Sequence, residues 1–244
     1  MQCVYWYTIF FVTVNYCAIA VADRFHGFKR PCKTTSPECL RRSLQAVLPD
    51  FVKGIPELGI PSLDPLKVQN IDFVLPGGIT VEIKEGFTKG LRKCRVDSVR
   101  NIGGNQYEVK FHCNLLTKGK YRSKGQFLMF PIDGEGESKI KCKNLKVTCT
   151  FRIVTTTKPD GTQHFQIQDF KSSHDYEGRV TFHLTNLFKG NPEISQAVLK
   201  FLNENWRSVS EEFGGPFFEY GVISILNNIK KFLDIIPIDQ LEAV

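Results

Sequence analysis

The sequence lacks the short motifs that mark most hydrolases and metal enzymes. It has no Gly-x-Ser-x-Gly segment, so it offers no nucleophile elbow for an esterase acting on a lipophilic substrate. Its five histidines form no His-Glu-x-x-His motif and no pair at helical spacing, which leaves no recognisable zinc site. His112 and His183 fall on the polar sides of alternating stretches, where we expect them to face solvent. We therefore expect no enzyme activity, no metal and no cofactor.

Charge is missing from the first part of the chain, residues 1–22. An apolar run from Val4 to Val14 is followed by Ala20-Val21-Ala22, a small-x-small ending just before Asp23. This pattern predicts a signal peptide over 1–22 and a secreted, extracellular protein. The alternative is an uncleaved membrane anchor, because the stretch approaches the roughly 20 apolar residues that span a bilayer. No later segment is as long and apolar, so we expect residues 23–244 to form one soluble domain.

Cysteine usage is consistent with export. Cleavage after residue 22 removes Cys3 and Cys17 and leaves six cysteines, an even number that favours disulfides in a secreted chain. Cys32 and Cys39 are close enough, within loop-like sequence, to pair with each other. The chain has no Cys-x-x-Cys motif, which weakens redox and zinc hypotheses.

The other four cysteines have no assigned partners. Cys142 and Cys149 share one stretch that we expect to be extended, where their separation is about 23 Å. A disulfide cannot cross that distance, so these two pair only if the chain turns near Asn144. We expect Cys94, Cys113, Cys142 and Cys149 either to add a second bridge or to remain buried thiols.

The formal net charge is +7, and the lysines are spread along the chain. The densest group is Lys139, Lys141, Lys143 and Lys146. Three of these lysines alternate with Ile140 and Cys142, which is typical of a strand with one solvated face. No aromatic-basic platform accompanies them, so we expect no nucleic acid partner. Weak attraction to anionic lipid surfaces is the remaining interpretation.

Most of the chain shows the period of β-strands. Ser36-Pro37-Glu38 predicts a helix start, and that helix should end near Lys53-Gly54. From about residue 67 to 188 the apolar residues alternate with polar ones, most clearly over 79–84, 107–115, 146–153 and 180–184. Turn-forming sequences at 76–78, 103–105, 133–136 and 159–161 separate these stretches. The acidic residues at 133–137 resemble calcium ligands, but the interleaved glycines favour a hairpin turn. We expect a long antiparallel meander with one dry face.

The C-terminal segment predicts the cover for that dry face. Apolar residues from Ile194 to Phe213 recur at spacings of three and four, which predicts one helix of about 20 residues. Gly214-Gly215-Pro216 should kink or break it. The segment from Phe217 to Ile236 is apolar on nearly all sides and should be buried on all sides. We therefore predict an α+β fold in which a strongly curved antiparallel sheet wraps a long C-terminal helix.

The 20 phenylalanines indicate an interior rich in aromatic rings. These rings either fill a solid core or line a cavity around a guest. Export and the absence of catalytic motifs favour the cavity.

Several ordered motifs identify a family resemblance. They are Pro31-Cys32 with Cys39-Leu40, 53–61 (Lys-Gly-Ile-Pro-Glu-Leu-Gly-Ile-Pro), 63–66 (Leu-Asp-Pro-Leu), Gly119-Lys120-Tyr121 with Gly125, 130–136 (Phe-Pro-Ile-Asp-Gly-Glu-Gly), 187–190 (Leu-Phe-Lys-Gly), 201–206 (Phe-Leu-Asn-Glu-Asn-Trp) and 237–241 (Pro-Ile-Asp-Gln-Leu). Their order and spacing resemble the insect takeout and juvenile hormone-binding protein family over about 29–241. The 201–206 run is closer to the takeout branch, although Cys94, Cys113, Cys142 and Cys149 depart from its two-cysteine pattern.

This resemblance implies a tubular lipid-binding fold with an internal hydrophobic tunnel, and a disulfide between Cys32 and Cys39. It implies a secreted carrier that transports or sequesters a terpenoid or another small lipophilic ligand, which we expect to act as a monomer. The alternative is an interaction or signalling module that contacts membranes or receptors transiently. An exposed basic-aromatic patch would be the feature of that alternative.

The dry faces of the predicted strands and helices provide the candidate ligand-binding residues. From the sheet these are Phe73, Val81, Tyr107, Phe111, Phe127, Met129, Phe182 and Leu184, and from the helices Phe201, Phe217, Tyr220 and Ile223. Tyr107 and Tyr220 combine an apolar ring with a hydroxyl, so they are the candidates for contact with a ligand oxygen.

Overall fold

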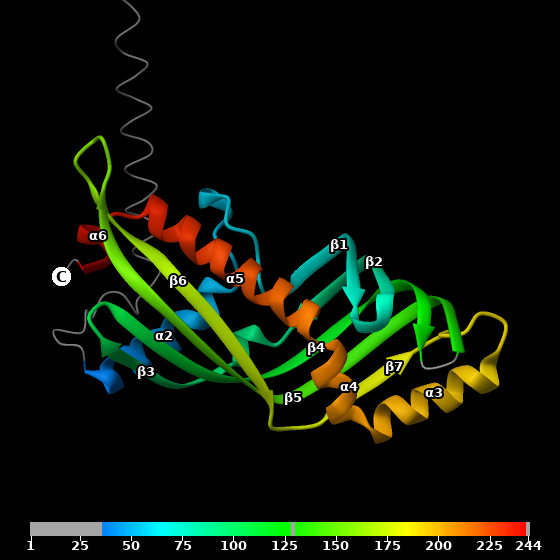
Figure 1. The fold of residues 1–244 in the computed structure, drawn as a ribbon. Helices are drawn as coiled ribbons and strands as arrows, with labels where there is room; N and C mark the ends of the chain where they lie inside the picture. The colour runs from blue at the N-terminus through cyan, green and yellow to red at the C-terminus, as the bar shows by residue number, and fades with distance from the viewer. Residues whose placement is uncertain (1–35, 128–129, 243–244) are drawn as a thin grey trace, which may run out of the picture.

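The computed structural model describes residues 36–127 and 130–242 (Figure 1). The helices are α2 (Pro37–Phe51), α3 (Pro192–Glu204), α4 (Trp206–Phe213), α5 (Gly215–Ile235) and α6 (Ile238–Glu242), with the short 3-10 turns η1 (Pro56–Leu58), η2 (Pro76–Gly78) and η3 (Leu91–Lys93). The strands are β1 (Leu66–Leu75), β2 (Ile79–Lys89), β3 (Arg95–Gly103), β4 (Gln106–Phe127), β5 (Phe130–Thr157), β6 (Gln163–Tyr176) and β7 (Val180–Leu184). The predicted signal peptide, Cys32 and Met129 lie outside the described residues.

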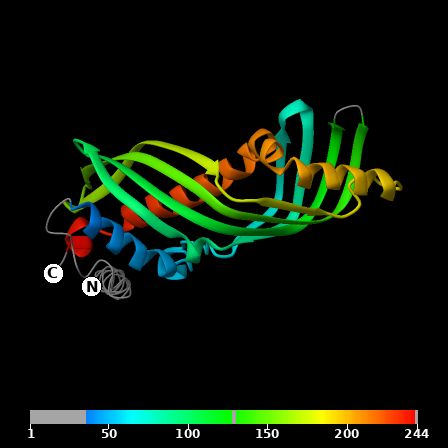
Figure 2. The same cartoon turned by 90° about the horizontal axis from the view of Figure 1, so that it is seen from below.

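One seven-stranded antiparallel sheet dominates the structure. Its two long strands, β4 and β5, pair from Gln106↔Arg152 to Phe127↔Phe130. Along the free side of β4, β2 pairs with one half and β3 with the other. Along the free side of β5, β6 and β7 divide the strand in the same way. The result is a long, strongly curved sheet, as the sequence pattern predicts (Figures 1 and 2).

The helices cover the concave side and the ends of this sheet. α5 runs along the sheet and packs against β6 and β1, α2 lies with β3 at one end, and α3 lies beside β7 at the other (Figures 1 and 2). The helix predicted from Ser36 is present as α2, and the predicted break near Gly214 separates α4 from α5. A Cβ on Gly214 would lie 2.4 Å from the Ser210 carbonyl oxygen, so the tight junction needs a glycine.

The single helix predicted from Ile194 to Phe213 was wrong, because the structure divides it at Asn205. Asn205 leaves the helical region, with φ −103° and ψ 30°. Its side-chain amide donates a hydrogen bond to the Phe201 carbonyl oxygen at 3.0 Å, and this carbonyl also accepts from the Asn205 backbone amide at 2.9 Å. The apolar stripe nevertheless continues from α3 into α4, since Leu202 and Val209 are both buried.

The turn predicted at 133–136 was also wrong, because these residues lie inside β5. The glycines at 134 and 136 have a different role, which is to allow a close approach of another backbone segment. A Cβ on Gly134 would lie 2.3 Å from the Leu187 carbonyl oxygen, and one on Gly136 would lie 2.2 Å from that of Thr185. The chain that follows β7 therefore crosses directly over the backbone of β5, and side chains at these positions would block it.

A disulfide between Cys94 and Cys113 joins the start of β3 to β4. Cys39 is disulfide-bonded as well, and its expected partner Cys32 lies outside the described residues. Cys142 and Cys149 are free thiols on the continuous strand β5. The expectation that an extended stretch keeps these two apart is confirmed.

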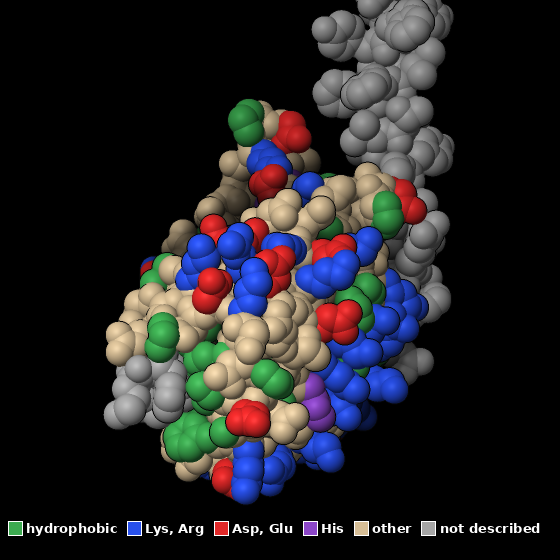
Figure 3. All heavy atoms as spheres, turned by 90° about the vertical axis from the view of Figure 1, so that its right-hand side faces the viewer, with side chains coloured by type: hydrophobic (Ala, Val, Ile, Leu, Met, Phe, Trp, Pro, Cys, Tyr) green, Lys and Arg blue, Asp and Glu red, His purple; other side chains and the backbone are tan. Residues whose placement is uncertain are grey.

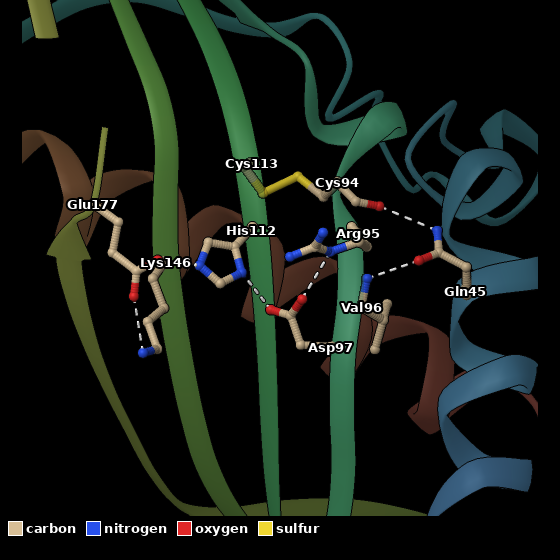
Figure 4. Close-up of polar contacts among 9 residues, drawn as sticks. All are labelled: Gln45, Cys94, Arg95, Val96, Asp97, His112, Cys113, Lys146 and Glu177. Atoms are coloured by element: carbon tan, nitrogen blue, oxygen red, sulfur yellow. Dashed lines mark hydrogen bonds and ion pairs between the residues drawn. A yellow bond between two sulfur atoms is a disulfide. The ribbon is translucent and has the colours of Figure 1, made fainter. Parts of the chain in front are cut away.

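Polar contacts fix β3 on both of its sides, close to the disulfide (Figure 4). The Gln45 side chain on α2 donates to the Cys94 carbonyl oxygen at 3.1 Å and accepts from the Val96 amide at 2.7 Å. His112 lies between the carboxylates of Asp97 and Glu177, with its side chain only 15% exposed. The solvent-facing position expected for His112 was therefore wrong: its ring bridges β3 and the loop after β6, a loop that the sequence does not show to be its neighbour.

We expect loss of the Cys94–Cys113 disulfide to destabilise the fold. The bridge closes a loop with a sequence separation of 19, and a bridge of this kind stabilises a domain by about 2–4 kcal/mol. The Cys94→Ala/Cys113→Ala variant should lose free energy of unfolding in that range, as measured by urea titration followed by circular dichroism. Each single variant should lose nearly as much as the double variant, because either change breaks the bridge. An unchanged urea midpoint would contradict a stabilising role.

Candidate functional site

An apolar cavity of about 360 Å³ lies between the concave face of the sheet and helices α3 to α5. Strands β1, β2, β4, β5 and β7 contribute to its wall. The alternation of side chains along a strand determines which residues line the cavity, because every second residue faces the same side of the sheet. On β4, for example, Phe111, Cys113, Leu115, Tyr121 and Ser123 all line the cavity.

Aromatic contacts close the cavity between β1 and α5. The Phe73 ring lies 4.4 Å from the Phe217 ring and 5.9 Å from the Tyr220 ring, both measured between centroids. Phe73 is buried, and the two helix residues are half-buried. This contact joins the first strand of the sheet to the start of the long helix, so it seals one side of the space.

Seven of the twelve predicted binding residues lie on the cavity wall. They are Phe73, Val81, Phe111, Phe182, Leu184, Phe217 and Tyr220. These residues come from four strands and one helix, and the curvature of the sheet brings them around one space. Whether they contact a ligand stays a prediction.

Three predicted residues lie elsewhere. Tyr107 is near the far end of β4, where its ring stacks on that of Phe151 at 6.2 Å. Phe201 on α3 and Ile223 on α5 are 41% and 46% exposed, because each lies on a helix side that no strand covers. Of the two tyrosines proposed for contact with a ligand oxygen, Tyr220 therefore lines the cavity and Tyr107 does not. Met129 and the side chain of Phe127 lie outside the described part of the chain.

Several wall residues were not among the predicted binding residues. Tyr121 and Ser123 continue the period of two along β4, past the point where lysines and glycines obscure the pattern. Cys142 continues the period after Ile140 on β5. Counting alternate positions from Phe111 without a break would have found the first two residues.

Burial raises the pKa of tyrosine and cysteine side chains in and near the cavity wall. It raises the pKa of the Tyr121 hydroxyl to about 12, and this hydroxyl donates to the Thr185 carbonyl oxygen at 3.0 Å. Burial also raises the pKa of the Cys142 and Cys149 thiols to about 11. Only Cys142 of these two thiols lines the cavity. Protonated thiols are poor nucleophiles, so the Cys142 thiol in the wall reacts slowly at neutral pH.

Two further observations concern the described residues only. No three of their His, Cys, Asp or Glu side chains gather closely enough to hold a metal ion. Among the helices over 36–127 and 130–242, none has the length and hydropathy required to span a bilayer.

A curved antiparallel sheet closed by helices around an apolar cavity defines a protein that binds lipophilic ligands. A family model described as "Haemolymph juvenile hormone binding protein (JHBP)" matches residues 9–242, so the chain belongs to this family. The structure is similar to that of Takeout 1 from Epiphyas postvittana, with a TM-score of 0.80 and 36% identity over 86% of this chain and 97% of that one.

Two curated relatives are named circadian clock-controlled protein daywake. The Drosophila melanogaster protein is 24% identical over 207 residues, which cover 80% of this chain and 79% of the relative. The Drosophila yakuba protein is 26% identical over 212 residues, which cover 77% and 78% of the two chains. The resemblance inferred from the ordered motifs is thus confirmed for family and fold.

We expect both free thiols to react slowly in the folded protein. A pKa raised from 9.0 to about 11 leaves about a hundredfold less thiolate at pH 8. The rate of reaction with Ellman's reagent should rise about tenfold per pH unit up to pH 11. Cys142→Ala and Cys149→Ala should each remove one slow phase, and urea should make both phases fast. Rapid labelling of the folded chain at pH 8 would show that these thiols are not buried.

Proposed function

We propose that the protein is a secreted, monomeric carrier that transports or sequesters a small lipophilic ligand in the cavity. A juvenile hormone-like terpenoid or another lipid suits its aliphatic and aromatic wall. The observation that carries this proposal is an apolar cavity of about 360 Å³ inside a fold of the juvenile hormone-binding family. The volume lies within the range of about 300–1,000 Å³ that is usual for sites of small molecules.

The wall accounts for a useful affinity without many directional contacts. A guest that buries about 400 Å² of apolar surface gains roughly 10 kcal/mol at 25 cal/mol per Å². Loss of free motion and ordering of side chains remove much of this gain, which leaves affinities from micromolar to nanomolar. An elongated apolar space extending from Phe111 to Ile79 favours a chain-like molecule over a compact one.

Secretion is part of the proposal and has two supports. The uncharged segment 1–22 has the pattern of a signal peptide. The Cys94–Cys113 disulfide is typical of proteins that fold in oxidising compartments. Both features agree with a carrier that works in an extracellular fluid.

Narrowing the cavity should weaken binding. Phe111→Trp adds volume at the wall, and overpacking of this kind costs about 1–3 kcal/mol. We expect the dissociation constant for farnesol to rise about five- to a hundredfold, as measured by displacement of the apolar dye N-phenyl-1-naphthylamine. Ile223→Trp is the matched control, because Ile223 is exposed and outside the cavity. Failure of the unaltered protein to bind either dye or farnesol would reject the carrier function.

A second candidate function is an interaction module at membranes, and the outer face of the sheet favours it. One row across five strands reads Lys67, Phe87, Lys118, Lys139 and His183. The row lines an outer groove, and the Lys89 ammonium lies 4.8 Å above the centre of the Phe87 ring. Figure 3 shows Lys and Arg side chains gathered along one flank of the molecule.

This row supplies the aromatic partner that the lysine pattern alone did not reveal. Among the described residues, Lys67, Lys118 and Lys139 form no ion pair, whereas neighbouring Lys120 pairs with Glu85 at 2.6 Å. Unpaired lysines beside a half-buried aromatic ring are suited to anionic lipid headgroups. Such contact would place the carrier where lipids are loaded or released.

Flotation with vesicles tests this second function. The protein should float with vesicles that contain phosphatidylserine at low salt, and remain behind at high salt or with phosphatidylcholine alone. Lys118→Glu/Lys139→Glu should abolish flotation. Lys200→Glu/Lys230→Glu makes the same change of charge on helices α3 and α5, away from the groove, and should preserve it. Equal losses in both variants would show that only net charge matters.

A further inference from the structure

The cavity wall contains a hydroxyl group that has no hydrogen-bond partner. Ser123 on β4 is only 4% exposed and lines the cavity, yet its Oγ has no partner among the described residues. Buried hydroxyls in folded proteins are almost always paired, because an unpaired one loses its bonds to water and gains nothing in return. Ser123 is therefore an exception that needs an explanation.

The other serine and threonine side chains of the wall show how unusual this is. Ser138 donates to the Gly119 carbonyl oxygen at 3.1 Å, and Ser210 donates to that of Trp206 at 2.7 Å. The hydroxyls of Thr88 and Thr117 lie 2.9 Å apart and bond to each other. The fold thus satisfies each of these hydroxyls internally and leaves the buried hydroxyl of Ser123 without a partner.

The position of Ser123 makes the two ends of the cavity wall chemically different. In the sheet it lies opposite Val81 on β2 and Gly134 on β5, near the end formed by the β1–β2 turn. Phe111 and Cys113 lie at the opposite end of the wall on the same strand. The wall at one end of the cavity therefore contains a buried hydroxyl with no partner, and the rest of the wall toward Phe111 is mostly apolar.

We propose that Ser123 forms a hydrogen bond to an oxygen atom of the ligand, and so selects oxygenated over purely hydrocarbon guests. This inference rests on the proposed carrier function. The ligand class is a long apolar chain with an ester, carbonyl or alcohol oxygen near one end. That oxygen lies at Ser123, and the chain extends toward Phe111.

A pair of probes that differ in one polar group tests the selection. Methyl farnesoate and farnesene share an apolar terpenoid chain, and the first adds an ester. Displacement of N-phenyl-1-naphthylamine should show that the unaltered protein prefers methyl farnesoate. Ser123→Ala should reduce the ratio of the two affinities about five- to tenfold, and it should leave the affinity for farnesene unchanged.

Ser138→Ala is the matched control, because its hydroxyl lines the same cavity but already has a partner. It should preserve the ratio of affinities. Ser123→Thr keeps the hydroxyl and should retain the preference for the ester. Thermal unfolding without ligand should give Ser123→Ala a melting temperature equal to or above that of the unaltered protein, since the hydroxyl has no partner to lose.

The outcomes separate this inference from the carrier function. If the unaltered protein binds both probes and Ser123→Ala keeps the same ratio, the selection by Ser123 is refuted while the carrier function stands. A clear loss of stability in Ser123→Ala would also refute it, because the hydroxyl would then have a structural partner. If neither probe displaces the dye, the carrier function fails and the inference fails with it.

Discussion

The pairing of β4 with β5 is the interaction on which the rest of the structure depends. These strands form one antiparallel ladder that runs from end to end of β4, and all other strands except β1 pair directly with one of them. Because the natural twist of a sheet accumulates along such long strands, the sheet curls and its apolar face becomes concave. A concave apolar face cannot be covered by a flat layer, so a helix lies along it and an elongated space remains.

Backbone approaches determine how tightly this space is closed. Gly134 and Gly136 allow the chain after β7 to cross β5, and Gly214 allows α4 to turn into α5 against Tyr176. The closing segments therefore sit closer to the sheet than side chains would permit. Large rings, such as those of Phe73 and Phe217, fill the remaining gap between β1 and the helix. Small residues bring the walls together, and large ones seal the junctions.

Periodicity predicts much of the fold, and seven of the twelve candidate binding residues that it selects lie on the cavity wall. Alternation is a local property, so it places Val81, Phe111 and Phe182 on the dry face without knowledge of the partner strands. It fails where the deciding contact is distant. The glycines at 134 and 136 resemble a turn until the crossing chain is seen, and a helix that is apolar all round does not reveal that Ile223 lies on its uncovered side. The unpaired state of Ser123 is likewise invisible, since it depends on what surrounds it in space.

The disulfide occupies a gap in the sheet that hydrogen bonds do not close. β2 pairs with β4 from Leu116 onward and β3 pairs with it up to His112, so on this side of β4 no strand pairs with the short interval between them. Cys113 lies in that interval and is bonded to Cys94. A covalent link thus replaces the missing ladder at a seam next to the cavity. The integrity of this part of the wall consequently depends on the redox state of its surroundings, because reduction of the Cys94–Cys113 bond would remove the covalent link at this seam.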